Sequence, residues 1–142
     1  MILDASVVVA AYLPDEEWSD RALAVIAGVL DQRAGNLVPM TCWLEVAQAL
    51  VRATRRGRLP MSAVEAAEDS LAGLIEHVPG RDVSAVESMR VALDLGLGVY
   101  DSSYLVLSRA TEQPLITADR SLFDIGLRAG YDMVWLGDLA ID

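Results

Sequence analysis

Short apolar segments alternate with longer helical segments along almost the whole chain, and this alternation restricts the fold more than any other feature. Apolar strands are predicted at residues 1–3, 37–39, 75–78, 115–117 and 133–136. Helices are predicted over residues 5–13, 15–33, 42–56, 60–74, 81–95, 101–111 and 119–130. Apolar strands separated by helices are typical of a parallel sheet whose two faces are covered. We therefore expect one α/β domain over residues 1–142, with a short, mostly parallel central sheet flanked by about seven helices.

Polar and glycine residues mark several boundaries of the predicted helices. The acidic residues 15–17 would lie in the first turn of the second helix, where the helix dipole favours negative charge. Thr41 is placed to cap the helix over 42–56, and Gly57 follows its end.

Four carboxylate residues fall where strands end or helices begin. Asp4 and Asp119 follow predicted strands, Asp101 lies at a predicted helix start, and Glu45 lies within the first turn or so of another helix. Ligands of parallel α/β sheets bind at the carboxyl ends of the strands, where loops and helix N-termini converge. We therefore expect all four side chains to be able to reach one edge of the sheet.

A cluster of carboxylates needs a cation, because like charges repel and buried carboxyls otherwise take up protons. Cys42 is the only cysteine and His77 the only histidine, which excludes a thiolate cluster and disfavours zinc. Hard cations prefer such oxygen ligands, so the predicted cofactor is Mg²⁺ or Mn²⁺. One or two of these ions can activate water and stabilise the leaving oxygen in phosphodiester cleavage.

The charge of the chain bears on nucleic-acid binding in two opposite ways. A formal net charge of −10 disfavours nonspecific binding to a polyanion. All 11 basic residues are arginines, however, and Arg52 and Arg56 fall on the same side of their predicted helix as Glu45. They are candidate RNA contacts that lead phosphate to the acids. An ordinary solvated helix face with cations near its C-terminus explains them equally well.

Structural roles also explain each acid taken alone. Asp4 can simply end a strand, and Asp101 and Asp119 can cap the helices that follow them. Glu45 lies opposite the apolar side of its helix, which is typical of a solvated glutamate. The functional interpretation therefore depends on the four positions jointly.

The segments ILDAS, WLEVAQAL, VYDSSYLVLSRA and PLITADRSLFDIG, in this order, resemble the pattern of PIN-domain ribonucleases of the VapC toxin type. The resemblance spans nearly the whole chain. It implies that Asp4 and Asp101 are the primary metal ligands and that Glu45 and Asp119 act directly or through water. It also implies that the hydroxyls of Ser6 and Thr117 support the site by hydrogen bonding.

The same resemblance implies a metal-dependent endoribonuclease, the toxin of a VapBC-type toxin–antitoxin pair, that hydrolyses structured RNA such as transfer or ribosomal RNA. Its implied partners are a cognate VapB-like antitoxin and a second copy of itself as a homodimer. Some family members carry a further acid near Asp124, whose spacing from Asp119 on a helix would turn it away from the site. The N-terminus MILDAS lacks a secretory pattern, and residues 7–13 are too short an apolar run to span a membrane, so the cytoplasm is expected.

Other classes with acidic α/β sites fit the sequence less well. Receiver domains use a lysine beside their acids, and this chain has none. A haloacid-dehalogenase-like phosphatase needs Asp-x-Asp after the first strand, where this chain has Ser6 in the second position. A P-loop NTPase is excluded because its glycine-rich loop and lysine are missing. A noncatalytic PIN-like RNA- or protein-binding module remains the alternative, and metal-dependent cleavage separates the two.

Overall fold

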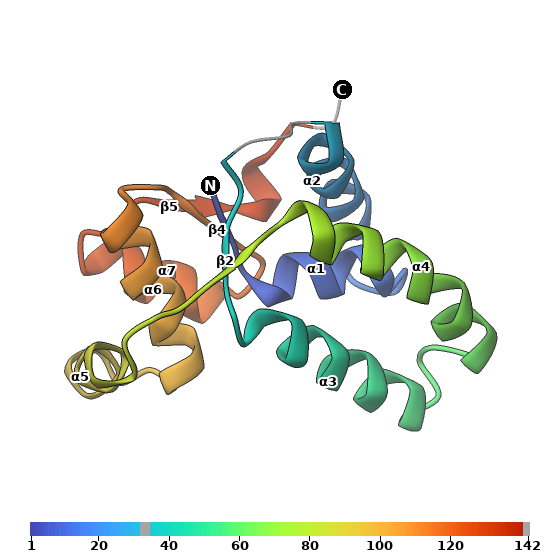
Figure 1. Ribbon diagram of the computed structural model, residues 1–142, viewed down its shortest axis with the longest axis horizontal. Coiled ribbons are helices and arrows are strands. Elements are labelled where there is room, and N and C mark those ends of the chain that lie inside the picture. Colours follow the sequence, from blue (N-terminus) through green and yellow to red (C-terminus); the bar gives the residue numbers. More distant parts are fainter. Residues whose placement is uncertain (32–34, 141–142) are drawn as a thin grey trace.

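Seven α-helices surround a set of short strands in the computed structural model, which describes residues 1–31 and 35–140. The helices are α1 (Ala5–Tyr12), α2 (Ser19–Asp31), α3 (Cys42–Arg55), α4 (Met61–His77), α5 (Ala85–Leu95), α6 (Val99–Thr111) and α7 (Arg120–Arg128). The strands are β1 (Ile2–Leu3), β2 (Val38–Pro39), β3 (Gly80–Arg81), β4 (Leu115–Thr117) and β5 (Met133–Trp135), followed by a short 3-10 helix, η1 (Leu136–Asp138). In Figure 1 the strands cross between α1–α4 at one end and α5–α7 at the other. No helix in the described ranges is both long and apolar enough to cross a membrane.

All strand pairs in the described part of the chain are parallel. One sheet has the order β1-β4-β5, and β2 pairs with β3 in a second. A bridge between Ile2 and Leu37 joins the two, and the backbone N–H of Leu3 donates to the carbonyl of Leu37 at 3.1 Å. β1 therefore lies between β4 and the segment that enters β2. The predicted fold class, an α/β domain with a short parallel sheet and seven helices, is confirmed.

The prediction of a strand at residues 75–78 is wrong, because α4 continues through this segment as far as His77. The apolar pair Leu74 and Val78, four residues apart, is buried, while Ile75 is 41% exposed. That burial pattern has the period of a helix, not of a strand. The third strand, β3, instead forms at residues 80–81, where the backbone N–H of Met40 donates to Arg81 at 3.0 Å.

The acidic residues 15–17 do not form the first turn of α2, which begins only after this segment. Two of them, Asp15 and Glu16, bind the guanidinium of Arg58 at 2.8 and 2.7 Å. Contacts with a residue beyond α3 therefore hold them, and the local preference for a helix start is overridden. α2 is described as far as Asp31, so its predicted end near residue 33 lies outside the described residues.

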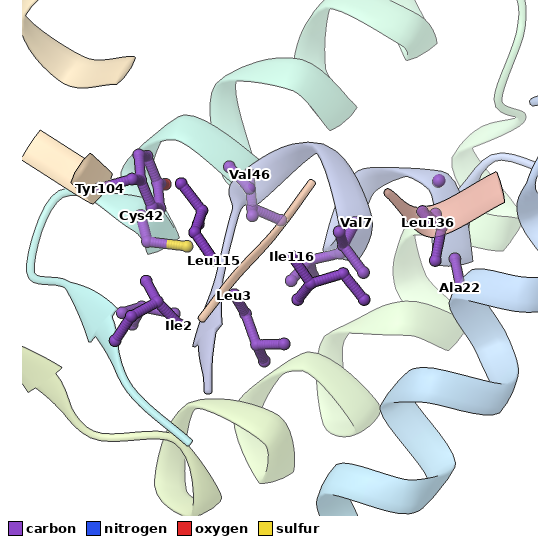
Figure 2. Close-up of a cluster of buried hydrophobic side chains, with 14 of the residues drawn as sticks. Ile2, Leu3, Val7, Ala22, Cys42, Val46, Tyr104, Leu115, Ile116 and Leu136 are labelled. Carbon is purple, nitrogen blue, oxygen red and sulfur yellow. The ribbon is translucent and has the colours of Figure 1, made fainter. Parts of the chain in front are cut away.

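The two central strands form the middle of the hydrophobic core. Ile2 and Leu3 of β1, and Leu115 and Ile116 of β4, are fully buried. Figure 2 shows them packed among side chains of the surrounding helices, including Val7 of α1. Burying one such side chain stabilises the fold by about 1.5–3 kcal/mol. The ends of β1 and β4 are consequently fixed, and so are the polar residues that follow them.

Candidate functional site

One pocket is lined by all four acids named from the sequence. Asp4, Glu45, Asp101 and Asp119 surround a cavity of about 560 Å³. They come from the end of β1, from α3, from the first turn of α6 and from the β4–α7 connection. The pocket also includes the side chains of Ser6, Leu44, Gln48, Arg52 and Tyr100. The fold thus brings together residues that are separated by up to 115 positions in the chain.

Asp4 is the most deeply buried of these acids, with 5% of its surface exposed. It occupies the N-terminal cap position of α1, and its backbone N–H donates to the carbonyl of Ile116 at 3.0 Å. Burial raises the pKa of its carboxyl to about 6, and the nearby carboxylates of Asp101 and Asp119 act in the same direction. An ionised Asp4 is therefore costly to the metal-free protein at neutral pH.

Two hydroxyls hold the carboxylate of Asp4. Ser6 and Thr117 both donate to its Oδ2 atom, at 2.5 and 2.6 Å, and both oppose the rise in its pKa. The same hydroxyls accept backbone N–H groups, Ser6 from Ala118 and Thr117 from Asp119, each at 2.9 Å. This network ties the start of α1 to the end of β4. Both hydroxyls therefore contact Asp4 directly, and their support of a metal site stays a prediction.

Glu45 is half-buried on α3, and two hydroxyls donate to its Oε1 atom. Thr41 does so at 3.2 Å and Tyr104, from α6, at 3.1 Å. The Thr41 hydroxyl does not make the predicted cap hydrogen bond, because it turns toward Glu45. Burial raises the pKa of Glu45, and the carboxylates of Asp4 and Asp101 add to the rise. Tyr104 was missed from the sequence, where its position in an apolar helical run is typical of a core residue.

Asp101 and Asp119 also line the pocket. Asp101 is half-buried, and burial followed by the charge of Asp119 raises its pKa. Asp119 is exposed and caps α7, its Oδ1 atom accepting the backbone N–H of Leu122 at 3.0 Å. The capping role considered for Asp119 is therefore real, and the residue also lines the pocket. Asp124 does not line it and pairs with Arg120 at 3.1 Å.

The donors around the pocket fit a hard divalent cation by their chemistry. They are carboxylate oxygens, and Arg52 is the one cationic side chain lining the pocket in the described ranges. Burial raises the pKa of Asp4, Glu45 and Asp101, and neighbouring carboxylates add to the rise in each case, so a bound cation would favour the ionised forms of all three. As placed, no three His, Cys, Asp or Glu side chains of the described residues converge closely enough to bind a metal ion. Binding would therefore need side-chain adjustment around the pocket.

The two candidate RNA-contacting arginines differ in position. Arg52 lines the acidic pocket. Arg56 lies outside it, in an adjacent depression of about 170 Å³ that Arg52 and Ala49 also line. Arg58 lines the same depression but is occupied by its ion pairs with acidic residues. Arg52 is therefore better placed than Arg56 to meet a phosphate held at the acids.

Comparison with known proteins gives a family and a structural relative. A family model described as PIN domain matches residues 1–126, a range that contains all four acids. A crystal structure of PAE2754 from Pyrobaculum aerophilum is similar, with a TM-score of 0.73 and 22% sequence identity over 96% of this chain and 90% of that chain. At this identity the likeness concerns the fold alone. No curated protein matches the sequence.

Proposed function

This chain belongs to the PIN-domain family, and from that membership we propose that it is a metal-dependent endoribonuclease, the toxin of a VapBC-type toxin–antitoxin pair, hydrolysing structured RNA such as transfer or ribosomal RNA. PIN domains are generally nuclease modules that use divalent metals such as Mg²⁺. The single observation that carries the proposal is the pocket lined by four acids, one of them almost fully buried. Such an arrangement is unfavourable without a cation, so stability alone does not account for it.

In the proposed site, Asp4 and Asp101 are the principal ligands of Mg²⁺ or Mn²⁺, and Glu45 and Asp119 bind it directly or through water. When bound, the cation supplies a readily deprotonated water and neutralises charge on the reacting phosphate. The hydroxyls of Ser6 and Thr117 both donate to Asp4. They orient its carboxylate and favour its ionised form.

Electrostatics supports a cationic partner as well as a cationic cofactor. We propose that a VapB-like antitoxin covers the acidic pocket with a cationic segment. The chain carries 21 acidic and 11 basic residues, and this excess attracts such a segment. A homodimer is proposed on the family resemblance alone.

The test is cleavage of RNA by purified, antitoxin-free protein. Total RNA from the host is incubated with Mg²⁺, with Mn²⁺ or with a chelator, beside an Asp4→Asn variant, and the new ends are mapped. We expect discrete cuts that need metal and that disappear in the variant, because Asp4 lines the acidic pocket and is the most deeply buried of its four acids. Cuts that persist in Asp4→Asn would place the chemistry elsewhere. No cutting with any metal would favour the noncatalytic PIN-like binding module.

Replacing Arg52 with alanine should raise the KM for RNA more than it lowers kcat. A hydrogen bond from a charged group contributes about 1.5–3 kcal/mol, so losing one phosphate contact should raise KM about 10-fold or more. The slope of log affinity against log salt concentration should fall by about 1. Arg56→Ala should have a smaller effect, since Arg56 lies outside the pocket. Arg90→Ala, an exposed change on α5, is the control, and equal KM values for all four proteins would remove the phosphate-guiding role.

A further inference from the structure

The carboxylate of Glu45 is held from one side only. The hydroxyls of Thr41 and Tyr104 both donate to Oε1, and no described hydrogen bond ends on Oε2. Two donors on one oxygen fix the rotation of a carboxylate while leaving its second oxygen available. Glu45 lines the acidic pocket, so the available oxygen belongs to a group in the wall of that cavity.

Tyr104 differs from an ordinary core aromatic in what its hydroxyl does. Its side chain is fully buried, and its ring lies beside Cys42 among the core residues (Figure 2). A phenylalanine would fill the same space without a polar atom, whereas a buried phenol needs a hydrogen-bond partner. Tyr104 finds that partner in Glu45, 59 residues away in the chain. The contact therefore joins the core directly to the acidic pocket.

The position of Tyr104 on α6 couples two acids of the pocket. Asp101 lies three residues before Tyr104, on the same helix, and therefore on nearly the same face. One turn of α6 thus supplies the carboxylate of Asp101 to the pocket and the hydroxyl of Tyr104, which donates to Glu45 on α3. Any shift of α6 relative to α3 would move Asp101 and release Glu45 together.

We propose that Tyr104 is a positioning residue, which with Thr41 anchors Oε1 of Glu45 so that Oε2 is presented to the divalent cation. This inference rests on the proposed metal-dependent function. Hydrogen-bond partners behind a metal ligand set its orientation, and their loss typically weakens metal affinity 10- to 100-fold. Tyr104 itself does not line the pocket, so it acts through Glu45.

Tyr104→Phe removes the donor and keeps the ring. We expect it to bind Mn²⁺ about 10-fold more weakly than the natural protein, measured without RNA by isothermal titration calorimetry. The Mg²⁺ concentration needed for half-maximal cleavage should rise by a similar factor, and cleavage should recover at high Mg²⁺. Tyr12→Phe is the matched control, because the hydroxyl of Tyr12 also makes one hydrogen bond, to Ser70 at 2.9 Å, but lies outside the pocket.

Thermal unfolding shows whether Tyr104→Phe is folded. Thr41→Val is an independent variant, because it removes the other hydroxyl that donates to Oε1 of Glu45. Unchanged Mn²⁺ affinity in the folded Tyr104→Phe protein would overturn the positioning role, while the natural protein's own binding and cleavage would keep the proposed function intact. A natural protein that neither binds Mn²⁺ nor cuts RNA would overturn both proposals. A purely structural role for Tyr104 would lower the unfolding temperature without changing the metal affinity.

Discussion

The Asp4→Asn variant is expected to be more stable than the natural protein when both are metal-free at pH 7.5. Burial raises the pKa of Asp4 from 3.8 to about 6, so ionising it costs the folded state up to about 3 kcal/mol. Asparagine is neutral, and its carbonyl oxygen can still accept from both Ser6 and Thr117, since both hydroxyls donate to the same oxygen of Asp4. Urea unfolding at pH 7.5 in the presence of a chelator measures the difference.

The direction of this effect follows from the raised pKa of Asp4. The stability associated with its protonated form is fully present below pH 3.8 and is lost as the pH rises through about 6. The difference between natural protein and variant should therefore be small near pH 4 and develop between pH 4 and 6. A residue that the fold would be more stable without is characteristic of a functional site.

Asp94→Asn is the control for the change of charge, because Asp94 is exposed on α5 and its substitution should alter stability by less than about 0.5 kcal/mol. Added Mg²⁺ should stabilise the natural protein and not Asp4→Asn, since a ligand stabilises only the state that binds it. An Asp4→Asn protein less stable than the natural one at pH 7.5 would contradict the cost assigned to the buried carboxylate.

Thr117→Val should destabilise the protein by about 2 kcal/mol at pH 7.5, in the direction opposite to Asp4→Asn. The substitution keeps the shape of the side chain but removes a hydroxyl that donates to a buried carboxylate at 2.6 Å. A hydrogen bond to a charged group contributes about 1.5–3 kcal/mol. The backbone N–H of Asp119 loses its acceptor as well. The loss should be smaller near pH 4, where Asp4 is protonated.

A double-mutant cycle isolates the interaction between Thr117 and Asp4. We expect the effect of Thr117→Val to shrink when Asp4 is already asparagine, because the acceptor is then uncharged. Thr54→Val provides the comparison, since the Thr54 hydroxyl donates only to the carbonyl of Leu50 in its own helix. A Thr117→Val protein that is no less stable than Thr54→Val, or a cycle with no coupling, would show that the hydroxyl does not support the charge of Asp4.

The direction of the strands explains why two of the acids could be expected near each other from the sequence. Asp4 follows β1 and Asp119 follows β4, and parallel strands bring their carboxyl ends to one edge of the sheet. This inference needs only the recognition of short apolar strands and the direction rule for crossover connections. The same pattern fixed the fold class, because a strand of two or three apolar residues is stable only when helices cover it.

Local signals failed where a distant contact outweighed them. Residues 75–78 were predicted to form an apolar strand, but α4 continues as far as His77, with Leu74 and Val78 both buried in the core. Asp15 was predicted to lie in the first turn of a helix, but in the structure it precedes α2 and forms an ion pair with Arg58. In the first case the burial of an apolar side chain, which contributes about 1.5–3 kcal/mol, outweighs a helix or strand propensity of less than about 1 kcal/mol per residue.

The sequence by itself determined the order of the elements, the parallel sheet and the four acids as candidates, because strand polarity and residue type are properties of the chain. Only the tertiary structure decided that Asp4 is nearly buried and that Tyr104 reaches Glu45. Burial and hydrogen bonding between distant helices depend on how α3 and α6 pack on the sheet, and no spacing along the chain encodes that packing.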